Sequence, residues 1–260
     1  MRIPIYQVDA FTSTVFAGNP AAVCLLDAWL PDEQLQGIGT ENNLSETAFL
    51  VRKGDGFEIR WFTPATEIEL CGHATLASAF VLFNCRDWSE DTVRLESREK
   101  GTLTVNKKGD LIELDFPART AQPAKPPAGL CEALGVEPQS TLRSEEDMVV
   151  VVDAEQTVRG LAPDFGALSD VDCRGTIVTA KGNTVDFVSR FFAPRIAIPE
   201  DPVTGAAHCA LTPYWAGVLG KNTLHALQVS PRGGELKCEH RGDRVLIAGK
   251  AVLYLEGTIT

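Results

Sequence analysis

The chain has 260 residues, enough for one large domain or for two of about 130, and either arrangement buries a substantial core. A content of 44% hydrophobic and 23% charged residues is ordinary for a globular protein and argues against a disordered chain. The net charge of −11, with 24 scattered Lys and Arg residues, argues against a nucleic-acid partner, because phosphate contacts need clustered basic side chains.

The N-terminal stretch MRIPIYQVDAF alternates in the manner of a strand and has no signal-peptide core. No apolar run along the chain reaches the roughly 20 residues that a membrane span needs. We therefore expect a cytoplasmic protein with no membrane partner.

Alternation of apolar and polar residues predicts mostly strands in the first half of the chain. Residues 30–40 are instead predicted to form a helix, because Pro31 near their start and the acidic residues after it are typical of a helix N-terminus. Residues 72–84 (GHATLASAFVLFN) are predicted to form a second helix. This helix is apolar on all sides, so we expect it to be buried. The strands are expected at residues 2–10, 47–52, 57–62, 92–97, 101–107 and 111–116.

The segment 117–127 (PARTAQPAKPP) is rich in Pro and Ala and predicts a linker between two lobes. The lobes are expected at residues 1–120, to which a C-terminal strand can cross back, and at residues 121–260. The second lobe contains another apolar helix at residues 205–219. Its strands are expected at residues 147–152, 173–180, 186–192, 223–230, 235–241 and 244–256.

An internal repeat relates the two halves. The stretch IRWFTPATEIELCGHATLASAF leads into the first apolar helix, and VSRFFAPRIAIPEDPVTGAAHCAL leads into the second. Phe62 and Phe192 in these stretches are 130 residues apart, half the length of the chain. The residues themselves are only weakly similar, so the inference depends on their order and spacing. We infer an α+β fold of two pseudo-symmetric lobes, each a curved, mostly antiparallel sheet around a buried central helix.

Each apolar helix begins with a glycine, Gly72 or Gly205, after a strand that ends in Phe-x-Pro and a polar loop. A helix N-terminus presents unpaired N–H groups and a partial positive charge, which favours an anionic ligand. If a pseudo-two-fold axis relates the lobes, both helix starts can face one cleft and bind a carboxylate. The alternative is that the two glycines only form tight turns.

Three polar residues near these features are candidates for proton chemistry. Glu46 begins an apolar strand, where a partly desolvated carboxylate can take and return a proton, although exposure statistics favour a solvated residue. His73 lies in the first turn of a buried helix, where the dipole favours a neutral ring that either binds a ligand or caps its own helix. Asp201, just before Pro202, is by default an Asx turn or a helix cap.

The cysteines and histidines of the chain do not predict a metal site. The seven cysteines are odd in number and widely spaced without a CxxC pair, and none of the four histidines lies in an HExxH pattern. Cys71 stands at a helix start, where thiols are reactive, but no cysteine stands at the start of the second helix. A two-thiol racemase is therefore disfavoured, as are hydrolases, kinases and dehydrogenases, whose motifs are missing.

Five linked stretches of the chain resemble the PhzF family. They are VDAFTSTVFAGNPAAVCLLD, ENNLSETAFL, ELCGHATLASAFVL, EDPVTGAAHCALTPYW and SPRGGELKCEHRGDRVLIAGKAVLYLEG, in the order of the family from end to end. The resemblance implies the fold of diaminopimelate epimerase, with two similar lobes that each enclose a helix. It also implies a cofactor-free and metal-free isomerase that shifts a proton on a small cyclic or amino carboxylate, and it is compatible with a homodimer.

The resemblance assigns roles to positions of this sequence. Glu46, His73 and Asp201 match the family's catalytic residues, and this overrides the structural interpretations of Glu46 and Asp201 given above. Ala206 replaces a serine of the phenazine enzyme, so the resemblance leaves open whether the dihydro-hydroxyanthranilate substrate of that enzyme applies here. Two alternatives stay open: an amino-acid epimerase that uses the Cys71 thiol, and a catalytically silent binding or interaction protein. The implied substrate-binding positions are Asn19, Ser45, Gly72, Ala74, Thr75, Gly205, Ala206 and Ala207.

Overall fold

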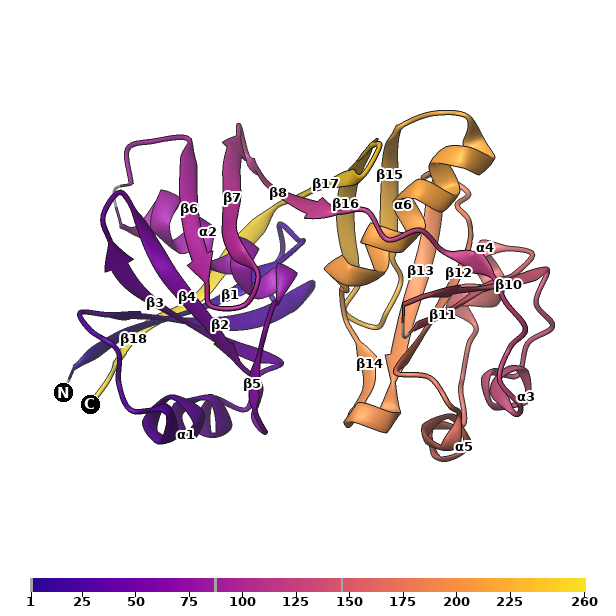
Figure 1. Cartoon of the computed structure of the whole chain (residues 1–260), viewed down its shortest axis with the longest axis horizontal. Helices are drawn as coiled ribbons and strands as arrows, with labels where there is room; N and C mark the ends of the chain where they lie inside the picture. The colour runs from indigo at the N-terminus through magenta and orange to yellow at the C-terminus, as the bar shows by residue number, and fades with distance from the viewer. Residues whose placement is uncertain (1, 87, 146) are drawn as a thin grey trace. The chain divides into compact units, whose positions relative to one another are not determined.

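The computed structural model describes residues 2–86, 88–145 and 147–260. The chain divides into two compact units, which are coloured along the sequence in Figure 1. Unit 1 contains Met1–Asp115 together with Ala248–Thr260, and unit 2 contains Phe116–Ile247. The chain therefore passes from one unit to the other twice.

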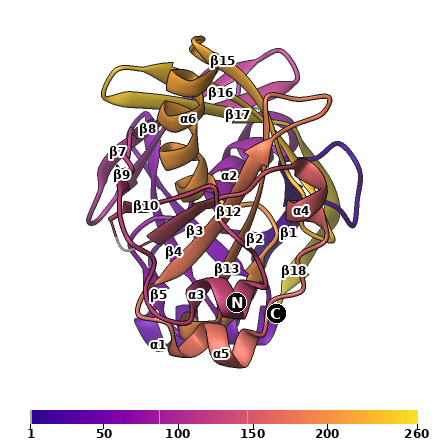
Figure 2. The same ribbon diagram turned by 90° about the vertical axis from the view of Figure 1, so that its right-hand side faces the viewer.

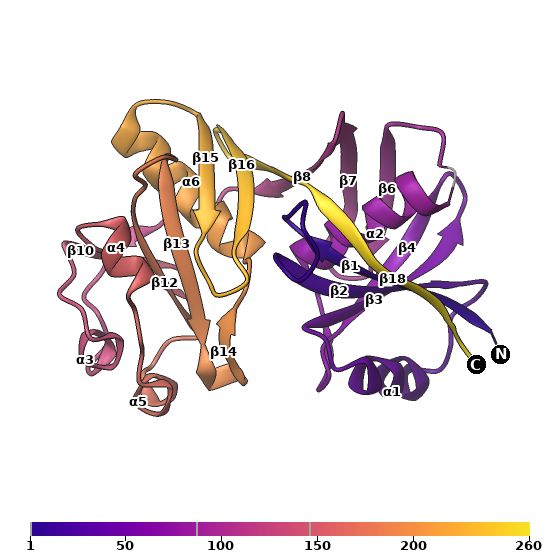
Figure 3. The same ribbon diagram turned by 180° about the vertical axis from the view of Figure 1, so that it is seen from behind.

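Unit 1 is a mixed sheet with one helix against each face. Neighbouring strands are mostly antiparallel, but β2 runs parallel to β3 and β4 runs parallel to β6. The C-terminal strand β18 pairs with β1, beside which it lies in Figure 3. The elements are β1 (Ile3–Ala10), β2 (Asn19–Leu26), α1 (Asp32–Asn42), β3 (Glu46–Lys53), β4 (Gly56–Phe62), β5 (Glu67–Ile68), α2 (Gly72–Cys85), β6 (Thr92–Ser97), β7 (Gly101–Lys108), β8 (Leu111–Pro117) and β18 (Ala251–Ile259).

The helix α2 is the centre of unit 1. It packs against β1, β2, β3, β7 and β18, so that the sheet wraps around it. Its small residues, among them Ala74, Ala77 and Ala79, are buried and let the strands approach the helix closely. The amphipathic α1 covers the other face of β3 and β4, where Leu35 packs with Phe49 in a separate cluster. The burial expected for α2 is thus observed.

Unit 2 repeats this plan with its own helix, α6, which Figure 2 shows from the side of this unit. Here β11 runs parallel to β12, and β13 runs parallel to β15. Three short helices cover the opposite face of the sheet and contribute Leu134, Val158 and Leu168 to its core. The elements are β9 (Gln122–Pro123), α3 (Leu130–Leu134), β10 (Ser140–Ser144), β11 (Asp147–Val151), α4 (Glu155–Arg159), α5 (Phe165–Asp170), β12 (Gly175–Lys181), β13 (Phe187–Ala193), β14 (Ile198–Asp201), α6 (Gly205–Leu219), β15 (Thr223–Gln228), β16 (Gly234–Arg241) and β17 (Arg244–Gly249).

The repeat predicted from the sequence is present in the strand register. Thr47 of β3 pairs with Phe62 of β4, and Thr176 of β12 pairs with Phe192 of β13. The prediction of an α+β fold with two similar lobes, each with a buried helix, is confirmed. The strand expected at residues 244–256 is instead two strands, β17 and β18, separated at Lys250, whose carbonyl accepts a hydrogen bond from the Thr12 N–H group.

A proline inside α6 shows how the predicted linker is anchored within unit 2. Pro213 has no N–H group, so the carbonyl of Cys209, four residues earlier, loses its helical partner. The backbone N–H of Arg119 donates to this carbonyl at 3.0 Å. The segment after β8 therefore docks on α6 and satisfies a buried acceptor that the helix leaves open.

A buried histidine of α6 predicts a pH-dependent stability. His208 is fully buried, its Nδ1 atom lies 2.8 Å from the Thr204 carbonyl, and burial lowers its pKa to about 4. The unfolded chain binds this proton near pH 6.5, so the free energy of unfolding should fall by about 2 kcal/mol between pH 7 and pH 5.

Urea denaturation at both pH values measures this loss. His208→Asn keeps a donor for the Thr204 carbonyl but does not titrate, so its stability should depend less on pH by that amount. An unchanged pH dependence would show that His208 is not responsible.

Candidate active site

Glu46 is the first residue of β3 and lies beside Ala21 in the parallel ladder with β2. It shares a face of the sheet with Ala48 and Leu50, which are buried under α2. Only 8% of Glu46 is exposed. The strand therefore holds a carboxylate in apolar surroundings, as the alternation of the sequence predicts.

His73 meets this carboxylate from the first turn of α2. Its Nε2 atom lies 3.0 Å from Glu46 Oε2, and both side chains are buried. The contact is not aligned as a hydrogen bond: neither atom has a hydrogen-bond partner in the described parts of the chain. Two buried groups able to exchange protons are thus in contact, and each retains the capacity to bind another molecule.

Two further side chains approach the other nitrogen of His73. Asn19 Nδ2 lies 3.2 Å from Nδ1, and Cys71 Sγ lies 3.4 Å from it. Asn19 is fully buried at the start of β2, and Cys71 stands at the N-cap of α2. His73 does not cap its own helix, so that alternative is wrong.

The charges in this cluster influence one another. Burial and the Glu46 carboxylate raise the pKa of the Cys71 thiol to about 11, so it is protonated at neutral pH. Burial opposes a charge on His73, but Cys71 and Glu46 outweigh it and raise the pKa of the ring well above its ordinary value. The sequence predicts a neutral ring from the helix dipole alone, because it does not reveal that Glu46 and His73 are in contact.

Glu46, Cys71 and His73 are also residue types that bind metal ions, and their ligand atoms lie within 4.8 Å of one another. A metal ion would require Cys71 to be a thiolate. It would also compete with the Asn19 amide nitrogen for His73 Nδ1, the ring nitrogen nearest the Cys71 sulfur. The arrangement fits proton transfer at Glu46 and His73 better than metal binding.

Other predicted positions of unit 1 lie around this pair. Gly72 is half-buried at the start of α2, and Ala74 is buried behind it. Thr75 uses its hydroxyl and its N–H group within the helix, since both donate to the Cys71 carbonyl. Ser45, half-buried, directly precedes Glu46. Their roles in substrate binding stay predictions.

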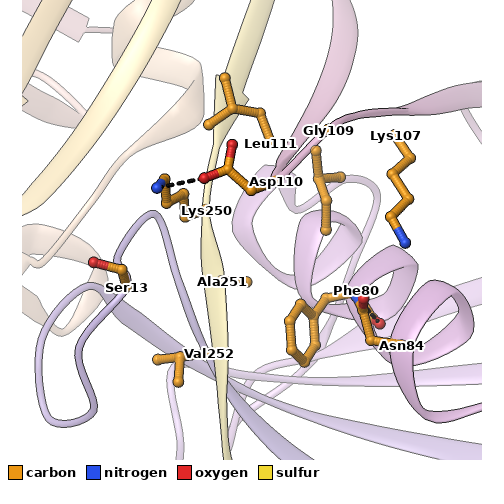
Figure 4. Close-up of a pocket in the computed structure, with 11 residues that line it drawn as sticks. Ser13, Phe80, Asn84, Lys107, Gly109, Asp110, Leu111, Lys250, Ala251 and Val252 are labelled. Atoms are coloured by element: carbon orange, nitrogen blue, oxygen red, sulfur yellow. Dashed lines mark hydrogen bonds and ion pairs between the residues drawn. The ribbon is translucent and has the colours of Figure 1, made fainter.

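A pocket of unit 1, about 250 Å³ in volume, is lined by neither Glu46 nor His73. It lies by the turn between β7 and β8, where Lys250 and Asp110 pair at 2.5 Å (Figure 4). Phe80 and Asn84 line its other side, together with Lys107. Lys250 and Asp110 already satisfy each other by their ion pair. Glu46 and His73 each have an atom without a hydrogen-bond partner among the described residues, so they are the better candidates for the active site.

Asp201 and the start of α6 form a separate polar cluster in unit 2. The Asp201 carboxylate accepts a hydrogen bond from the Thr204 hydroxyl at 2.5 Å, and Thr204 is the N-cap residue of α6. Gln228, which sequence reasoning missed, binds both sides of this turn: Nε2 donates to the Asp201 carbonyl and Oε1 accepts from the Thr204 N–H. The position of Gln228 at the end of a largely apolar strand was the feature of the sequence that could have identified it. Gly205 and Ala207 are buried here, and Ala206 is half-buried.

The repeat places no acid–base pair in unit 2. Glu46 precedes Thr47 in the ladder, and the residue before the corresponding Thr176 is Gly175. His73 follows the first glycine of α2, and Ala206 follows the first glycine of α6. The candidate acid–base pair therefore belongs to one copy of the repeat, which does not favour a mechanism with two equivalent bases.

A protein-family model described as PhzC-PhzF, Phenazine biosynthesis-like protein, matches residues 8–257. The chain belongs to this family. An uncharacterized isomerase of Pseudomonas aeruginosa is 52% identical over 259 residues, which cover 100% of this chain and 99% of that protein. The crystal structure of a PhzF-family phenazine biosynthesis protein from Enterococcus faecalis has a TM-score of 0.97 and 48% identity, with both chains fully covered.

More distant structures share the fold alone. A hydroxyproline epimerase from Agrobacterium vitis, crystallised with trans-4-hydroxy-L-proline, has a TM-score of 0.61 and 10% identity over 99% of this chain and 92% of that one. The PhzF-family chain therefore has the fold of the diaminopimelate epimerase-like proteins. Two of its relatives are named uncharacterized isomerases, and these names specify neither substrate nor mechanism. In the described residues, no helix is long and apolar enough to cross a membrane.

Proposed function

We propose that this PhzF-family protein is a cofactor-independent isomerase that moves a proton on a small cyclic or amino carboxylate. One observation carries the proposal: Glu46 Oε2 and His73 Nε2 lie 3.0 Å apart, both buried, and neither has a hydrogen-bond partner in the described residues. A substrate that forms hydrogen bonds with these two atoms removes the cost of leaving them unsatisfied, and this favours its binding.

Glu46 is the proton carrier in this mechanism. Its carboxylate takes a proton from a carbon next to an electron-withdrawing group, and the electron pair of the C–H bond moves into a new double bond. An adjacent double bond of the substrate breaks at the same time, and its π electrons form the new C–H bond at the far carbon. The protonated Glu46 then returns the proton to another carbon of the same substrate, so the reaction consumes no other reagent. His73 binds the substrate group on which negative charge develops.

The start of α2 supports a carboxylate substrate. The first N–H groups of a helix have no partner within the helix, and Gly72 leaves its backbone accessible. In unit 2, Ala206 has no hydroxyl where the phenazine enzyme has serine, so we expect a substrate other than that of the phenazine enzyme. The catalytic role of Asp201 stays a prediction.

Cys71 distinguishes this proposal from a thiol-assisted epimerase. A thiol with a pKa of about 11 is a poor base at neutral pH, and α6 has no matching cysteine at its start. Cys71→Ser should therefore lower turnover less than about 10-fold, whereas loss of a catalytic base costs about 10²- to 10⁴-fold.

Steady-state kinetics of Cys71→Ser measure this difference. Cys24→Ala is the matched control, because it removes a buried thiol of unit 1 that no described contact links to His73. A loss greater than about 10²-fold in Cys71→Ser alone would make the thiol a catalytic base.

Proton exchange at carbon tests the proposal directly. A panel of cyclic, amino and hydroxy carboxylates is incubated with the protein in heavy water, and NMR detects deuterium at carbon. Exchange that requires Glu46 supports the isomerase and identifies the substrate class. Silence across the panel, with no carboxylate bound at millimolar concentration, would favour the catalytically silent protein instead.

A further inference from the structure

The nitrogen of His73 that faces away from Glu46 has neighbours that donate hydrogen bonds. Asn19 Nδ2, an amide nitrogen with two hydrogens, lies 3.2 Å from Nδ1. Cys71 Sγ, the other neighbour at 3.4 Å, carries its own hydrogen at neutral pH. A proton on Nδ1 would point at the hydrogens of the Asn19 amide, whereas the Cys71 sulfur can either donate or accept. The Asn19 contact therefore favours Nδ1 as an acceptor.

The backbone holds Asn19 in this place. The preceding Gly18 has a φ of +66°, and a Cβ atom there would lie 2.2 Å from the Ala10 carbonyl oxygen, so only glycine fits this turn. Asn19 then pairs with Ala10 in the β1–β2 ladder. It lies two residues before Ala21, which is the neighbour of Glu46, so the amide and the carboxylate project from one face of the sheet.

Two influences on the ring oppose each other. Burial opposes a second proton on His73, and the Glu46 carboxylate from β3 favours one. Cys71, from the start of α2, is the other titratable group beside the ring and carries its own hydrogen at neutral pH. A second proton on the ring would occupy Nδ1, against the Asn19 amide hydrogen. The ring can become a cation only if the Asn19 amide turns its oxygen toward Nδ1.

We propose that Asn19 is a positioning residue that keeps the single proton of His73 on Nε2, the atom that faces Glu46. The inference rests on the proposed function for its consequence: a neutral ring with an Nε2–H group can donate to the substrate and gives Glu46 no cation to pair with. A doubly protonated ring would instead hold Glu46 in an ion pair and weaken it as a base.

Nitrogen NMR of the full-length protein, labelled with ¹⁵N at histidine, reports the tautomer without any substrate. His73→Gln assigns the signals among the four histidines of the chain. In the wild type at pH 7.5 we expect an unprotonated Nδ1 and a protonated Nε2. Asn19→Asp places a carboxylate acceptor at Nδ1 and should shift this nitrogen to the protonated position. Asn84→Asp, which adds the same charge at the exposed far end of α2, should leave the ring unchanged.

Turnover gives a second readout. Asn19→Asp should lower kcat/KM at least about 10-fold, because the wrong protonation state of a catalytic histidine slows the reaction even when the site is intact. A wild-type Nδ1 that carries a proton, or a tautomer that Asn19→Asp does not change, would overturn the proposal. Should Asn19→Asp not fold, the wild-type spectrum alone decides. The tautomer is measured without turnover, so failure of the isomerase proposal would show separately, as silence in the exchange assay.

Discussion

Replacing Glu46 by Gln is expected to lower proton exchange at the substrate carbon by about 10²- to 10⁴-fold. The amide keeps the size of the side chain but cannot accept a proton from carbon. Because Glu46 touches His73 through a contact that is not a hydrogen bond, the fold should tolerate the change. NMR-detected deuterium exchange and steady-state kinetics measure the loss, and circular dichroism checks the fold.

Two further variants make the test specific. Glu46→Asp retains the carboxylate but withdraws it from His73 by one methylene group, so partial activity is expected. Glu41→Gln removes an exposed carboxylate close in sequence and should leave exchange unchanged. Wild-type exchange in folded Glu46→Gln would show that Glu46 is not the proton carrier.

The largest expected loss of stability follows from a buried arginine of unit 2. Arg190 lies on β13, and its guanidinium donates from Nε and Nη2 to the two carboxylate oxygens of Glu200 at 2.7 and 2.8 Å. A third donor, Nη1, binds the Leu161 carbonyl, and the Phe192 ring lies 4.9 Å from the guanidinium carbon. Arg190→Ala leaves a largely buried carboxylate without its partner, so the free energy of unfolding should fall by about 3 to 5 kcal/mol.

The repeat offers a comparison for this prediction. Arg60, on β4, binds both carboxylate oxygens of Glu67 at 2.6 Å and lies over Phe62. The Glu67 side chain is 35% exposed, so Arg60→Ala should cost less than Arg190→Ala. Arg241→Ala is the control, because its pair with Glu239 is exposed and should contribute less than about 1 kcal/mol. Urea denaturation measures all three. If Arg190→Ala cost no more than Arg241→Ala, the buried pair would not stabilise unit 2.

Much of the fold could be predicted because its signals are local. The apolar composition of α2 and α6 predicts buried helices, and the spacing of Phe62 and Phe192 predicts a duplication that the ladders confirm. The strand β2 was not predicted, since NPAAVCLL lies between two sheet neighbours and shows no alternation. The short helices of unit 2 were also missed, because five or six residues give too little periodicity for a prediction.

The sequence by itself determined which residues are able to carry proton chemistry. Glu46 and His73 were candidates from their places at a strand start and a helix start. The pattern alone favoured a solvated Glu46, and the resemblance to the PhzF family made it a catalytic candidate. Only the tertiary structure decided that Glu46 and His73 are in contact and that Asn19 lies against the other nitrogen of the ring. The three residues belong to three separate elements, β3, α2 and β2. Contacts between residues 27 and 54 positions apart depend on strand register and helix packing, which no local pattern of the chain encodes.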